Sequence, residues 1–80
     1  MTSETVRRPT IYIPLLNEGT PVWRPTEGEF LRELTYRVLP AKDYNPREEH
    51  WEFPPGSIVI CERRVLHPGC EVLIAVRKIF

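Results

Sequence analysis

Residues 57–80, SIVICERRVLHPGCEVLIAVRKIF, form the stretch of this chain that decides its fold. Two apolar runs flank the tetrapeptide HPGC at positions 67–70. Proline followed by glycine is typical of a tight turn, because proline fixes φ and glycine tolerates positive φ. The stretch therefore predicts a β-hairpin in which Cys61 faces Val76.

This register gives the predicted hairpin two different faces. We predict that the core face is the one with most of the β-branched residues: Val59, Cys61, Val65, Val72, Ile74 and Val76. A slip by one residue would turn four charges toward the core, which argues for this assignment. The opposite face mixes charged residues with Ile58, Ile60, Leu73 and Ala75. Its apolar part, around Ile58, Ile60 and Leu73, is the second candidate for an interaction surface.

The chain before the hairpin is interpreted as short strands separated by turns. Nine prolines leave few segments in which a helix would be uninterrupted. Strands are predicted at residues 10–16, 21–31, 34–39 and 50–53, with the longest loop at 40–49. An alternative stays open at residues 27–34, where a capping box at 26–29 would begin a short helix. The strand spacing predicts an all-β fold, a small five-stranded and mostly antiparallel β-barrel.

Length and charge restrict the classes of protein that this chain can represent. Its 80 residues correspond to one domain, and we assign residues 1–9 to a flexible N-terminal tail and 10–80 to the barrel. Eleven basic and eleven acidic side chains give a net charge of zero. Neutrality argues against a dedicated nucleic-acid binder and favours a protein partner. The chain contains no apolar run of signal-peptide or membrane-span length, so we expect a cytoplasmic protein.

A more specific pattern runs through six segments of the chain. The segments are IPLLNEG at 13–19, VWRP at 22–25, YRV at 36–38, DYNP at 43–46, WEFPPGSIV at 51–59 and CE at 61–62. On this pattern the chain resembles an uncharacterised group of small bacterial proteins over most of its length. The resemblance implies an SH3-like barrel and no assigned activity. The chain departs from the pattern in a long connection at 30–34 and at Ile60, where a polar residue would be expected.

Aromatic residues beside prolines mark the predicted binding site. We expect an exposed aromatic groove that binds another protein, because small barrels recognise peptides with such grooves. The candidate partner-binding residues are Trp23, Arg24, Tyr44, Trp51 and Phe53, with Pro54 shaping the corner. The alternative for each tryptophan is a place in the core of the barrel. Arg24 should point away from Trp23 and form a surface ion pair with Glu18 or Glu52.

Other functions have weaker signals in this sequence. The first alternative is weak nucleic-acid binding by the basic residues of the last hairpin: Arg63, Arg64, Arg77 and Lys78. The second is a homodimeric subunit of a larger assembly. We predict no enzyme and no cofactor, because Cys70 beside His67 would lie on an exposed turn without an enclosed site.

The two cysteines are not expected to bind a metal or to form a disulfide. No CxxC or HxxxH spacing is present, which leaves a structural zinc site without support. Cys61 is predicted to be an inert buried thiol. Cys70 would lie far from it along the hairpin, beyond the reach of a disulfide.

Overall fold

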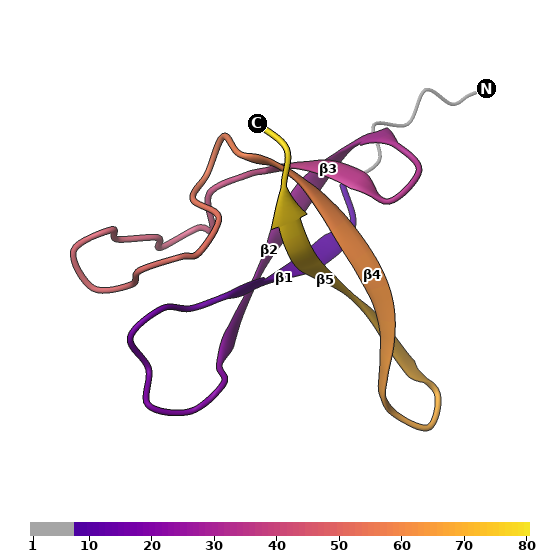
Figure 1. Cartoon of the computed structure of the whole chain (residues 1–80), viewed down its shortest axis with the longest axis horizontal. Helices are drawn as coiled ribbons and strands as arrows, with labels where there is room; N and C mark the ends of the chain where they lie inside the picture. Colours follow the sequence, from indigo (N-terminus) through magenta and orange to yellow (C-terminus); the bar gives the residue numbers. More distant parts are fainter. Residues whose placement is uncertain (1–7) are drawn as a thin grey trace.

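The computed structural model describes residues 8–80, except for the side chains of Leu66 and His67. Five strands follow one another: β1 (Thr10–Pro14), β2 (Trp23–Arg32), β3 (Thr35–Val38), β4 (Ile58–His67) and β5 (Cys70–Lys78). Each strand pairs antiparallel with the next, and β1 pairs in parallel with β5 to close the barrel (Figure 1). The predicted five-stranded, mostly antiparallel all-β fold is confirmed. Most of the predicted tail, residues 1–7, lies outside the described residues.

The core lies inside this ring and is built from alternate residues of the strands. Ile11 and Ile13 of β1 have no exposed surface, whereas Tyr12 between them is half-buried on the outside. Val38, Val59 and Cys61 are also fully buried. The alternation predicted for residues 10–16 is therefore confirmed. Across the described residues, no helix is present that has the length and hydropathy needed to cross a membrane.

The open question at residues 27–34 is answered by a β-hairpin. β2 continues through this segment to Arg32 and pairs with β3 from Gly28↔Val38 to Arg32↔Thr35. The short helix is therefore wrong. Leu34 takes the left-handed conformation (φ 57°) in the tight turn that replaces it. The register shifts between Phe30 and Arg32, so that the exposed Leu31 is an extra residue on β2.

The last hairpin has the predicted turn but a different register in its middle. Cys61 pairs with Ala75 instead of Val76, because Val76 is an extra residue on β5. A second extra residue, Leu66, lies on β4 near the turn. The two shifts cancel each other. The pairs next to the turn (His67↔Cys70) and at the open end of the hairpin (Ile60↔Arg77) are therefore as predicted, whereas the pairs between them are displaced by one residue.

This offset corrects the predicted core face. Ala75 is buried at 1% exposure, and Val76 is 39% exposed as the extra residue. Val72 and Ile74, which were predicted on the core face, lie on the same side as Tyr12, the outside, although Ile74 is only 6% exposed there.

Leu73 packs against the core instead of joining an outer patch. The prediction assumed one continuous register, and the bulge at Val76 reverses which residues of β5 point inward beyond it. Val65 keeps the same face as Cys61, because no bulge separates the two, but it is 67% exposed near the turn, beyond the core.

The connection between β3 and β4 is the longest in the chain, as predicted, and it closes one end of the barrel. It carries no full strand at residues 50–53, only a single bridge between Leu15 and Trp51. Its backbone is tied to β1, because Leu16 N–H donates to the His50 carbonyl and Glu52 N–H donates to the Pro14 carbonyl. Trp51 and Phe53 pack in the core from this connection.

Candidate functional site

The structure does not gather the six predicted partner-binding residues on one surface. Trp51 and Phe53 are buried at 5% and 6% exposure, whereas Trp23 is 43% exposed on the outside of the barrel. A groove that contains both tryptophans is therefore wrong. The long connection places the rings of Trp51 and Phe53 in the core, where they cannot contact a partner.

Arg24 joins β2 to the long connection. Its guanidinium forms ion pairs with Asp43 and with Glu49 (Nε to Oε1, 3.1 Å). The predicted partners Glu18 and Glu52 are wrong. Trp51 Nε1–H donates to the same Glu49 oxygen at 2.9 Å, so Glu49 links the arginine to a core tryptophan. Arg24 therefore acts as a structural tie between β2 and this connection.

The remaining predicted residues belong to this end of the barrel. The Tyr44 ring lies against Trp51, with centroids 4.5 Å apart and planes inclined by 59°. Pro54 is exposed at the corner that follows. A cleft of about 510 Å³ opens between β2 and residues 40–43. Its charged lining residues, Arg24, Glu27, Lys42 and Asp43, carry both signs and select no ligand class.

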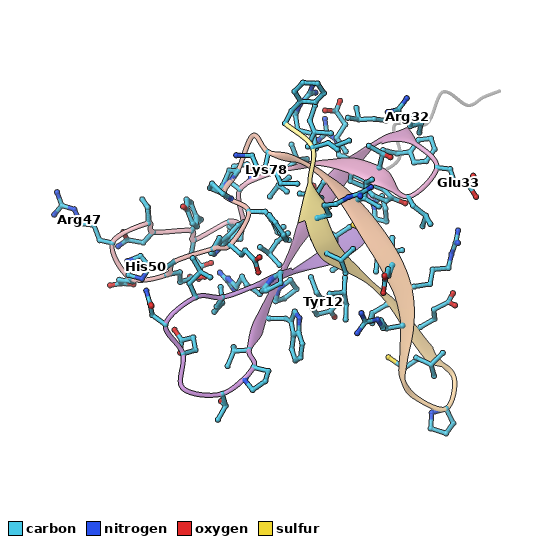
Figure 2. The ribbon with its side chains drawn as sticks, in the orientation of Figure 1. Tyr12, Arg32, Glu33, Arg47, His50 and Lys78 are labelled. Atoms are coloured by element: carbon cyan, nitrogen blue, oxygen red, sulfur yellow. The ribbon has the colours of Figure 1, made fainter. Side chains whose placement is uncertain are left out.

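A second surface, on the outside of β2, β1 and β5, gathers apolar side chains around Trp23. Trp23 lies opposite Pro14, and Pro25 lies opposite Tyr12. Tyr12 in turn lies beside Ile74 of β5. A groove of about 170 Å³ is lined by Tyr12, Trp23, Val72 and Ile74. Figure 2 shows Tyr12 between the β1–β2 ribbon and the β4–β5 ribbon, where β1 pairs with β5.

We call this surface the outer face and define it by nine residues. They are the apolar residues Tyr12, Pro14, Trp23, Pro25, Val72 and Ile74, with Glu27 at one edge and the paired Glu62 and Arg64 at the other. Sequence reasoning found Trp23 but missed Tyr12. The signal was available, because Tyr12 alternates with the buried Ile11 and Ile13 and must point outward.

The basic residues of the last hairpin do not form one patch. Arg63 and Arg64 are consecutive on β4 and point to opposite faces. Arg64 donates to Glu62 within the same strand (2.8 Å). Arg77 and Lys78 are exposed at the other end of β5, opposite Ile60 and Val59. The arrangement provides no continuous track of positive charge for a phosphate backbone.

Both cysteines are free. Burial raises the pKa of the Cys61 thiol to about 11, which favours the unreactive protonated form. Cys70 is half-buried beside the turn, and the His67 side chain, its predicted neighbour, lies outside the described part of the structure. No group of three or more metal-ligating side chains occurs among the described residues.

Comparisons with known proteins add no further assignment: no family model, curated protein or solved structure matches this chain. The function of this chain is therefore inferred from the geometry of the outer face.

Proposed function

We propose that this chain is a non-enzymatic protein-binding module and that its binding surface is the outer face. The observation that carries the proposal is the 43% exposure of Trp23 beside an apolar groove of about 170 Å³. Single exposed apolar residues are ordinary on protein surfaces. Here a tryptophan and a tyrosine line one groove together with Val72 and Ile74, which is the arrangement that protein interfaces favour.

The chemistry of the outer face supports a protein ligand more than a nucleic acid or a small polar substrate. Its middle is apolar, and its charged residues lie at two edges: Glu27 on β2, and Arg64 with its ion-pair partner Glu62 on β4. Tryptophan and tyrosine contribute large contact areas with few rotatable bonds, so little entropy is lost when they bind. We also assign the ring of five strands to the SH3-like barrels, on the sequence resemblance alone.

Site-specific photo-crosslinking tests the proposal directly. The photoreactive residue p-benzoylphenylalanine replaces Tyr12 in the full chain, and light is applied to living host cells. We expect one discrete protein adduct, formed either with a second copy of this chain or with another protein. The adduct should be lost when Trp23→Ala is added, because that change removes one wall of the groove.

The matched control places the same photoreactive residue at Leu31, which is 39% exposed at the far end of β2. Equal adducts from both positions, or none from Tyr12, would contradict the proposal. Adducts that nuclease removes would instead support nucleic-acid binding. Circular dichroism of each variant verifies that the barrel is folded.

A further inference from the structure

The outer face carries opposite charges at the two ends of one row of residues. Glu27 of β2 lies opposite Thr10 of β1, and Val72 of β5 lies opposite Arg64 of β4. Tyr12 pairs with Ile74 in the parallel β1–β5 pair, so Thr10 and Val72, each two residues earlier, lie at the same level. The row therefore begins with a carboxylate, passes over two uncharged residues and ends with a guanidinium.

Such a row is complementary to itself under a two-fold rotation. Consider a two-fold axis that lies in the interface, parallel to the strands and between β1 and β5. It would place Glu27 of each copy opposite Arg64 of the other, so that the dimer has two such pairs. The same rotation places Tyr12 over Ile74, so that an aromatic ring meets the floor of the groove. In a symmetric dimer both copies use the same patch, which requires this kind of self-complementarity.

The shape and the charge of the molecule allow this stacking. Two sheets with the same twist pack face to face with their strand directions within about 30°, and two copies of one sheet share one twist. The net charge of zero removes the general repulsion between copies. Arg64 is half exposed and donates two hydrogen bonds to Glu62, which leaves guanidinium N–H groups for a second carboxylate.

We propose that the outer face binds a second copy of this chain, as a face-to-face dimer with its two-fold axis along β1 and β5. This inference rests on the proposed function, because it names the partner of the same surface. Trp23 and Tyr12 form the centre of the interface above Ile74, which is 6% exposed and lines the groove, and Glu27 and Arg64 pair across its edges.

A charge exchange tests the pairing, with the association measured by sedimentation velocity of the full chain over a wide range of concentrations. The unaltered chain should be dimeric at the upper concentrations. Glu27→Arg and Arg64→Glu should each weaken the dimer on the order of tenfold, because each replaces two attractive contacts with two repulsive ones. The double variant Glu27→Arg/Arg64→Glu should restore it.

Two controls separate the interface from general effects on the surface. Arg37→Glu reverses a charge of similar exposure on β3, outside the outer face, and should leave the association unchanged. Trp23→Ala should abolish the dimer, whereas Leu31→Ala should not. Thermal unfolding of every variant verifies that the barrel is intact.

A chain that is monomeric at every concentration, or a double variant no tighter than the single ones, would overturn the dimer. That failure is distinguishable from failure of the proposed function. Photo-crosslinking from Tyr12 to a different protein, together with a monomeric chain, would retain the outer face as a binding surface and reject the second copy as its partner.

Discussion

Gly28 is the residue at which the barrel leaves no room for a side chain, so Gly28→Ala tests the packing of the core. It is buried in β2, opposite Val38. A Cβ atom at this position would lie 2.8 Å from Ile11 Cδ1 and 3.1 Å from both Ile11 Cγ2 and Tyr36 Cβ. Ile11 has no exposed surface, so its side chain cannot move into solvent.

The expected change follows from two opposing terms. Overpacking of a core by one methyl group costs about 1–3 kcal/mol. Replacing glycine by alanine lowers the entropy of the unfolded chain and returns about 0.4–1 kcal/mol. We therefore expect Gly28→Ala to lower the free energy of unfolding on the order of 1–2 kcal/mol.

Urea unfolding followed by tryptophan fluorescence measures this difference from the shift in the midpoint at constant m-value. Gly19→Ala is the matched control, because no atom lies within 4 Å of its added Cβ. It should be neutral or slightly stabilising. Ile11→Val removes the atom closest to the new Cβ, so the double variant with Gly28→Ala should lose less stability than the sum of the single variants. A Gly28→Ala chain as stable as the original would refute the reasoning.

Three further changes test other parts of the structure. Thr26 Oγ1 donates to the Leu39 carbonyl (2.6 Å), so Thr26→Val should cost about 1 kcal/mol or more by leaving a partly buried acceptor unpaired. Thr26→Ser should retain the bond, and equal melting temperatures for the two variants would contradict this. The pKa of Cys61 is raised from 9.0 to about 11, so the folded chain keeps a proton that the unfolded chain loses. The free energy of unfolding should be at its full value below pH 9 and fall by at most about 3 kcal/mol between pH 9 and pH 11. Urea unfolding measured at a series of pH values should show this fall for the original chain and not for Cys61→Ala. In the native state a thiol reagent should modify Cys70 quickly and Cys61 only after unfolding, and equal rates would show that Cys61 is accessible.

The architecture was predictable because the signals that set it are local. Alternation at Ile11 and Ile13, and the turn at Pro68 and Gly69, depend on neighbours in the sequence. The register inside the last hairpin was not predictable, because bulges are decided by how the strand must bend to close the ring. Val72, Ile74 and Val76 therefore appeared to belong to the core face. Val65 has the predicted face but lies near the turn, beyond the core.

The candidate site was harder to predict than the fold. Trp51 and Trp23 stand in similar aromatic and proline-rich surroundings, yet one is buried and the other exposed. The difference arises from the long connection, which folds back over the end of the barrel through the Leu15↔Trp51 bridge. No local pattern encodes that return, because its partners are separated by more than thirty residues. Tyr12, in contrast, followed from strand periodicity and was overlooked beside the tryptophans.

The two extra residues of the last hairpin, Leu66 on β4 and Val76 on β5, determine where this chain can change its length. Deletion of a paired residue in either strand would turn every residue beyond it to the other side of the sheet. Deletion of an unpaired bulge residue leaves all the other cross-strand pairs in place and only straightens the ribbon. We therefore expect natural variants and engineered chains to lose a residue at these two positions more readily than elsewhere in the hairpin, with the loss at Val76 opposing closure of the barrel.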